Sequence, residues 1–111
     1  MEISIKKEDS ISIEKYWGDL VPIMAIEEMS ELTQAISKTE RYISGKNRKS
    51  SSTQLNIQLV KEIADVCISL SALIEHYGLS YQQIQNLINQ KVLQKYGENE
   101  NDEKKDNSEK E

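Results

Sequence analysis

The amino-acid sequence predicts an all-α protein of about four helices. Apolar residues recur at spacings of three and four along most of the chain, and no segment alternates apolar and polar residues strongly enough to indicate a strand. With 111 residues and 37% hydrophobic content, the chain provides for one small domain with a single modest core. A core of this size would gain stability from a helical partner subunit.

Local signals give the expected ends of the first two helices. A short helix follows Ser10 as its N-cap and runs to Trp17, before Gly18. Pro22 fits the first turn of a long second helix, because its missing N–H has no intrahelical partner there. This second helix is expected to reach about Ser44.

Two further helices are expected after residues 45–53 (GKNRKSSST), which contain no apolar residue and are rich in loop formers. The third helix begins near residue 53 and stops at Gly78. Ser80 and Gln83 predict a capping box for the fourth, which runs to about Tyr96.

The helical domain is expected to span residues 10–97, between a flexible N-terminus at residues 1–9 and a disordered acidic tail at residues 98–111. The tail has seven acidic and three basic side chains, so it contributes −4 to the net charge of −5. The helical domain is therefore nearly neutral, and its charge does not exclude an anionic ligand.

The sequence favours a cytoplasmic protein without a membrane partner. Residues 1–9 lack the apolar stretch of a signal peptide, and the longest uncharged apolar run, residues 20–26, is too short to cross a bilayer. The lone Cys67 excludes an intrachain disulfide, which fits a reducing compartment.

Helical phase, at about 100° per residue, places two acidic pairs beside the expected core. On the second helix, Glu28 lies inside the apolar sector and Glu31 at its edge. On the third helix, Glu62 lies at the margin of the sector and Asp65 one step beyond. The two sectors consist of Val21, Ala25, Met29, Leu32 and Ile36, and of Leu55, Leu59, Ile63, Val66, Leu70, Leu73 and Ile74.

Four converging carboxylates need a positive partner, because charge beside a core is unfavourable when unpaired. Lys61 points about 100° away from Glu62 around the helix and is not expected to neutralise it. An all-carboxylate set suits Mg²⁺, with Mn²⁺ as an alternative, and disfavours Zn²⁺. Magnesium often shares its coordination with phosphates, which indicates a phosphate-bearing substrate. The alternative is that the pairs mark two solvated helix faces.

Basic and aromatic residues are candidates for substrate binding. Lys91 and Lys95 continue the apolar face of the fourth helix, where they either complement the helix dipole or contact a phosphate. Arg48 belongs to a basic cluster that is either a solvated loop or a set of phosphate clamps on a mobile lid. Trp17 either packs or stacks on a base. The basic cluster comprises Lys38, Arg41, Lys46, Arg48 and Lys49.

Two segments, residues 26–32 (IEEMSEL) and 61–66 (KEIADV), resemble the E-x-x-E and E-x-x-D signature of the MazG-like, all-α nucleoside triphosphate pyrophosphohydrolases. The likeness continues through residues 77–80 (YGLS) and 90–96 (QKVLQKY) and covers roughly residues 12–97.

The resemblance implies a bundle of about four helices completed by dimerisation, often further paired into tetramers. It implies that Glu28, Glu31, Glu62 and Asp65 hold Mg²⁺ and carry catalysis. The implied reaction cleaves a (d)NTP to a (d)NMP and pyrophosphate, in nucleotide-pool housekeeping. Lys91 and Lys95 would match phosphate-contacting positions, and Glu27 an auxiliary acid.

Other functions stay open at this point. Within the same superfamily, the substrate could be dUTP or dCTP, or phosphoribosyl-ATP. From a different class, the chain could be a catalytically idle helical oligomeric adaptor that binds another protein, through a surface that includes Ile23 and Ile26. No nucleic-acid partner is expected, because the net charge is negative.

Overall fold

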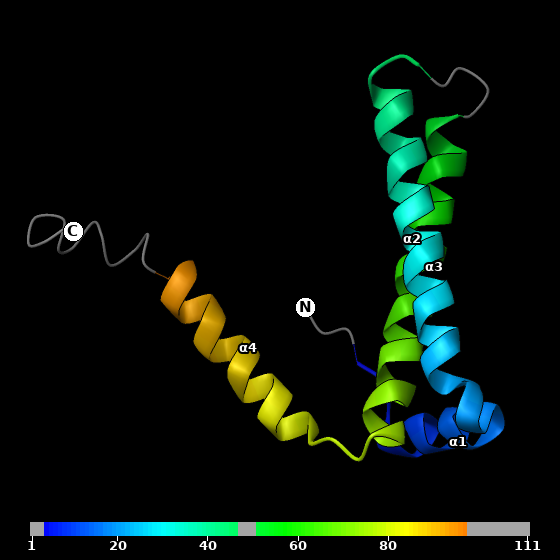
Figure 1. Ribbon diagram of the computed structural model, residues 1–111. Coiled ribbons are helices and arrows are strands. Elements are labelled where there is room, and N and C mark those ends of the chain that lie inside the picture. Colours follow the sequence, from blue (N-terminus) through cyan, green and yellow to red (C-terminus); the bar gives the residue numbers. More distant parts are fainter. Residues whose placement is uncertain (1–3, 47–50, 98–111) are drawn as a thin grey trace, which may run out of the picture. The chain divides into compact units, whose positions relative to one another are not determined.

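The computed structural model describes residues 4–46 and 51–97, and these residues form four α-helices, one 3₁₀ turn and no strand (Figure 1). The predicted all-α class is confirmed for this part of the chain. Arg48 and the tail at residues 98–111 lie outside it. Tertiary contacts divide the chain into two units, one ending at Leu79 and the other beginning at Ser80.

Helix α1 spans Lys7–Trp17 and begins earlier than predicted. Lys6, in extended conformation, is the N-cap. The prediction that Ser10 caps the helix is wrong: Ser10 is buried inside it, and its hydroxyl donates to the Lys6 carbonyl at 3.3 Å. The helix ends at Gly18, whose φ of 54° is accessible to glycine at little steric cost.

A 3₁₀ turn, η1 (Gly18–Leu20), leads into α2 (Val21–Ile43), which has Pro22 in its first turn as predicted. Helix α3 spans Ser52–His76. It begins about one residue earlier than predicted, because Ser51 and Gln54 form a complete capping box.

Gly78 terminates α3 with a Schellman motif. The Leu79 N–H donates to the Ile74 carbonyl at 2.9 Å, and the Gly78 N–H donates to the Glu75 carbonyl at 3.1 Å. Gly78 adopts the positive φ of 65° that this motif requires. The predicted stop at Gly78 is therefore confirmed, together with its physical cause.

Helices α2 and α3 pack side by side as an antiparallel hairpin (Figure 1). Along the contact between them, several buried residues are separated by seven or fourteen positions: Val21 and Ala35 on α2, and Leu55, Glu62 and Ser69 on α3. Glu28, partly buried, occupies the α2 position between Val21 and Ala35. We call this line of contact the seam.

The seam is narrower than the predicted apolar sectors. Met29 and Ile36 on α2 are 40% and 49% exposed, and Ile63 and Leu70 on α3 are 45% and 40% exposed. Met29 and Ile36 follow Glu28 by one and eight residues, and Ile63 and Leu70 follow Glu62 by the same numbers. Each separation corresponds to a rotation of about 80–100° around the helix. Because the helices are antiparallel, equal rotations bring all four side chains to the same side of the hairpin, which we call the apolar face.

Helix α1 crosses the end of the hairpin where α2 begins and packs against both helices (Figure 1). Ile13 and Leu73 pack there against a buried cluster of Val21, Met24 and Ala72. One ion pair and one close polar contact join α1 to α3: Lys7 Nζ lies 2.6 Å from Glu75 Oε2, and His76 Nδ1 lies 3.4 Å from Glu14 Oε2. These contacts fix the base of the hairpin, two helical turns from Glu28.

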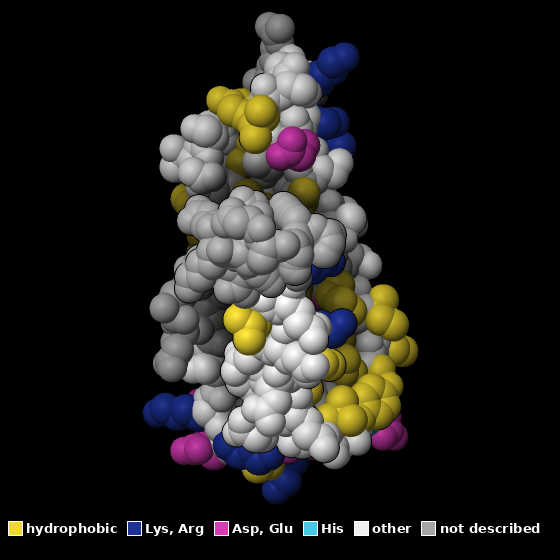
Figure 2. Space-filling model, turned by 90° about the vertical axis from the view of Figure 1, so that its left-hand side faces the viewer, with side chains coloured by type: hydrophobic (Ala, Val, Ile, Leu, Met, Phe, Trp, Pro, Cys, Tyr) yellow, Lys and Arg dark blue, Asp and Glu magenta, His cyan; other side chains and the backbone are white. Residues whose placement is uncertain are grey.

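Helix α4 (Tyr81–Lys95) belongs to the second unit. Ser80 caps it, accepting from the Gln83 N–H at 3.1 Å, which is one of the two hydrogen bonds of the predicted capping box. Leu87, Ile88 and Val92 are about half exposed. On the face that Figure 2 shows, hydrophobic side chains reach the surface of the described residues in several groups (yellow). Within the same ranges, no helix has the length and apolar character of a membrane span.

Candidate metal centre

The seam brings together three of the four predicted acids. One carboxylate oxygen each from Glu28, Glu62 and Asp65 lies within 4.8 Å of the other two. Glu28 comes from α2, and the other two come from successive turns of α3. Glu62 is only 5% exposed, so it lies in the centre of the helix contact, where the sequence had predicted the margin. We call these three residues the acidic cluster.

Close carboxylates are common on helix surfaces without any bound ion, so burial decides how the acidic cluster is interpreted. Oε1 of Glu62 and Oε1 of Glu28 are both buried without a hydrogen-bond partner. A buried oxygen of this kind loses its hydration and regains nothing from the protein, which destabilises the fold. A cation bound among these oxygens would compensate that loss. The donor set therefore fits a hard divalent cation.

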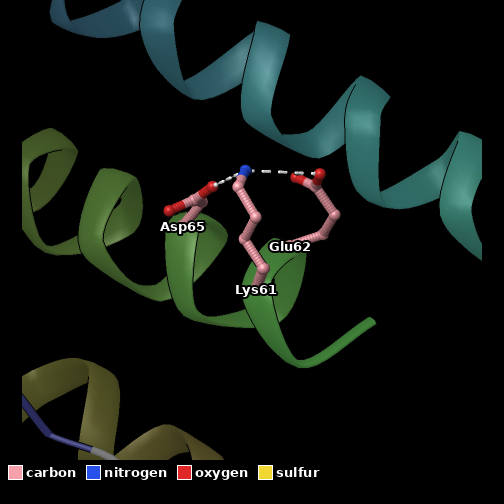
Figure 3. Close-up of polar contacts among 3 residues, drawn as sticks. All are labelled: Lys61, Glu62 and Asp65. Carbon is pink, nitrogen blue, oxygen red and sulfur yellow. Dashed lines mark hydrogen bonds and ion pairs between the residues drawn. The ribbon is translucent and has the colours of Figure 1, made fainter. Parts of the chain in front are cut away.

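Lys61 contacts the acidic cluster directly, contrary to the expectation from helical phase. Its Nζ donates to Asp65 Oδ2 at 2.9 Å and lies 3.6 Å from Glu62 Oε2 (Figure 3). Two signals could have predicted this: Lys61 and Asp65 have the i, i+4 spacing of a helical ion pair, and a lysine stem is long enough to offset a rotation of 100°. Hydrogen bonding and charge from Asp65 raise the pKa of Lys61.

The pKa of Glu28 is raised above its ordinary value of 4.5, first by burial and then by the negative charges of Glu31, Asp65 and Glu62. Lys61 opposes this shift only in part. The direction of the shift shows that the surroundings of Glu28 disfavour its charged form, and an added cation would reverse that preference.

The fourth predicted acid, Glu31, is exposed on α2, one turn beyond Glu28. It is not one of the three residues within 4.8 Å, but its charge is the largest electrostatic contribution to the Glu28 pKa. Glu31 therefore lies beside the acidic cluster, on its open side. The exposed Glu27 precedes Glu28 on the same helix.

The predicted substrate-binding residues have more separate positions. Trp17 ends α1 and is partly exposed, with its ring edge-to-face against Tyr16 at a centroid distance of 5.4 Å. Lys91 and Lys95 lie one turn apart on α4, in the second unit, and both are exposed. Arg48 lies outside the described residues.

Comparisons of the chain with protein-family models, with curated proteins and with solved structures found no match. The residues of the chain and the geometry of the acidic cluster are therefore the basis for inferring its function.

Proposed function

We propose that the chain is a Mg²⁺-dependent nucleoside triphosphate pyrophosphohydrolase that cleaves (d)NTPs to (d)NMPs and pyrophosphate in nucleotide-pool housekeeping. The observation that carries the proposal is the acidic cluster, in which Glu62 is buried in the α2–α3 contact and has an unpartnered oxygen. A buried carboxylate with one oxygen left unpartnered is unfavourable for a helical hairpin that serves only as a scaffold.

Glu28, Glu62 and Asp65 would hold Mg²⁺, with Mn²⁺ as an alternative. When bound, the ion would screen the triphosphate charge and polarise the attacked phosphoryl group. The seam fixes Glu28 and Glu62 before any ligand arrives, because both stand at positions where α2 and α3 are in contact. Such preorganisation lowers the entropy that ordering the ligand side chains would otherwise cost.

Glu31 is the candidate for the residue that positions and deprotonates water. It is exposed and adjacent to the acidic cluster, so a water molecule can reach it from solvent. The water oxygen would bond to the α-phosphorus, its proton would pass to the Glu31 carboxylate, and the bond from the α-phosphorus to the bridging oxygen would break. Pyrophosphate would leave with that oxygen.

Lys91 and Lys95 are proposed to contact the phosphates, since their spacing places two ammonium groups on one face of α4. Arg48 is a further candidate for a phosphate contact. Trp17 is proposed to stack on the nucleobase of the substrate, because its ring is partly exposed at the end of the hairpin where α2 begins.

A second copy of the chain is proposed to cover the apolar face defined by Met29, Ile36, Ile63 and Leu70. Two hairpins joined through these faces form a four-helix bundle, the arrangement in which amphipathic hairpins bury their remaining apolar surface. The acids Glu31 and Asp65 lie at the opposite rotation from the seam, so dimerisation through the apolar face leaves the acidic cluster open to a substrate.

The test is a pyrophosphate-release assay with Mg²⁺ across standard and damaged (d)NTPs, including dUTP, dCTP and phosphoribosyl-ATP. We expect release from at least one substrate and a loss of at least about a hundredfold in Glu62→Gln. Glu40→Gln is the matched control, because Glu40 is exposed and lies on α2 well beyond the acidic cluster.

Absence of release from every substrate, or equal rates for Glu62→Gln and the wild type, would refute the enzymatic proposal. In that case the exposed apolar face favours the helical oligomeric adaptor, which needs no metal. The two functions are separated further by adding Mg²⁺ alone, because only a metal-binding cluster is stabilised by it through mass action.

A further inference from the structure

We propose that Lys61 is a built-in counter-cation, which occupies the acidic cluster in the metal-free protein and leaves when a divalent cation binds. This inference rests on the proposed function, because it concerns the same metal site and says which group partly neutralises it before the metal binds. It predicts that the metal competes with a residue of the chain itself.

The Lys61 ammonium lies close to the carboxylates of the acidic cluster. Its Nζ is 2.9 Å from Asp65 Oδ2 and 3.6 Å from Glu62 Oε2, so it lies among the oxygens that would bind the metal (Figure 3). Exposed i, i+4 pairs are common on helices and contribute little. Lys61 differs from such a pair because its second contact is to the buried Glu62, whose other oxygen has no partner.

The acids at this site carry more negative charge than Lys61 can balance. Glu28, Glu62 and Asp65 bring three carboxylates together, with Glu31 beside them, and a single ammonium cannot neutralise these four acids. Glu28 is still surrounded by excess negative charge when Lys61 is present. A divalent cation at the same oxygens supplies more positive charge and repels the ammonium at short range. The Lys61 ammonium and the metal ion therefore cannot both stay at these oxygens.

The Lys61 side chain is exposed enough to turn away from the acidic cluster. The side chain is 63% exposed, so its ammonium can turn into water without disturbing the seam. Asp65, which receives the hydrogen bond, is partly buried and stays on the next turn of α3. Departure of Lys61 thus opens the acidic cluster by one side-chain rotation, with no movement of a helix.

The experiment is a titration of the 111-residue chain with MgCl₂ alone at constant ionic strength, in which calorimetry measures the affinity. We expect Lys61→Gln to bind Mg²⁺ about three- to tenfold more tightly than the wild type, because the competing ammonium is gone. Lys61→Arg keeps the charge and adds fork geometry for carboxylates, so it should bind Mg²⁺ more weakly than the wild type. Lys38→Gln removes an equal charge from the exposed surface of α2 and should leave affinity near the wild-type value.

A second measurement observes Lys61 itself. Reductive ¹³C-methylation of the lysines keeps their charge, and the NMR signal of methylated Lys61 is identified by its absence in Lys61→Gln. We expect this signal to move on addition of Mg²⁺, while that of Lys38 stays in place. The Lys61→Arg variant also guards against misfolding of Lys61→Gln, because its predicted effect has the opposite sign and it retains the cation.

The possible outcomes distinguish the inference from the proposed function. If Mg²⁺ binds to the wild type, and Lys61→Gln binds it equally or more weakly, the counter-cation role is wrong and the metal site stands. If neither the wild type nor any variant binds Mg²⁺ or Mn²⁺, the metal site itself is wrong, and the inference fails with it.

Discussion

Glu28 on α2 and Glu62 on α3 face the same seam, and each buries one carboxylate oxygen without a hydrogen-bond partner. The two helices thus meet through a pair of like charges at positions where a hairpin ordinarily places apolar side chains. This contact opposes folding in the absence of a bound metal ion, because Lys61 offsets the negative charge only in part, and it gives each acid a measurable effect on stability.

Replacing Glu28 with Gln should stabilise the metal-free protein by about 1 kcal/mol, because it removes a repelled, partly buried charge and supplies an amide donor beside the unpartnered Glu62 oxygen. Urea unfolding in the presence of EDTA measures the change. The same variant should lose most of the stabilisation that Mg²⁺ gives to the wild type. Glu27→Gln, on the exposed side of α2, is the control, and a Glu28→Gln protein less stable than that control would contradict the prediction.

Stability in EDTA should depend on pH through Glu28. Its folded-state pKa is raised above 4.5, so the folded protein retains a proton that the unfolded chain releases. The contribution of this group is therefore fully present below pH 4.5 and is lost as pH rises through the raised pKa. The gain in stability of Glu28→Gln over the wild type should accordingly grow with pH across this window. A gain that is constant from pH 4.5 upward would show that the pKa of Glu28 is not raised.

Replacing Ile63 with Ser should weaken the proposed dimer by at least about tenfold, because burying an isoleucine contributes about 1.5–3 kcal/mol. Sedimentation equilibrium or light scattering across a concentration series measures the dissociation constant. Ile57→Ser is the matched control, since Ile57 is also exposed on α3 but lies about 120° around the helix from Ile63. A wild-type chain that stays monomeric at high concentration would remove the dimer from the proposal.

The helices could be predicted from local signals because those signals act locally in the structure as well. Gly18, Pro22, Gly78 and Ser80 each occupy the turn or cap that their chemistry favours. The predicted start of α1 was wrong because the Ser10 hydroxyl donates to the Lys6 carbonyl within the helix. Serine shares this alternative to capping with few other residues.

The acidic cluster was predictable in part. Helical phase correctly placed Glu28 beside the core, but it centred α3 on residues such as Ile63, which are exposed, and left the buried Glu62 at the margin. The cause is that apolar residues line both the seam and the apolar face, and a single sequence does not separate the two. Lys61 was missed because phase describes where a Cβ points and ignores the reach of a long side chain.

The end of α2 at Ile43 and the start of α3 at Ser52 lie away from Glu28 and Glu62, with residues 29–42 of α2 and 53–61 of α3 between. This distal stretch includes the buried Ala35 and Leu55 and can pair early, since its contacts are close in sequence. Closure past Glu28 and Glu62 is then the later step, at which the negative charges meet. A cation that binds only after this step would slow unfolding and leave the folding rate almost unchanged, so the residence of the ion would set the lifetime of the folded hairpin.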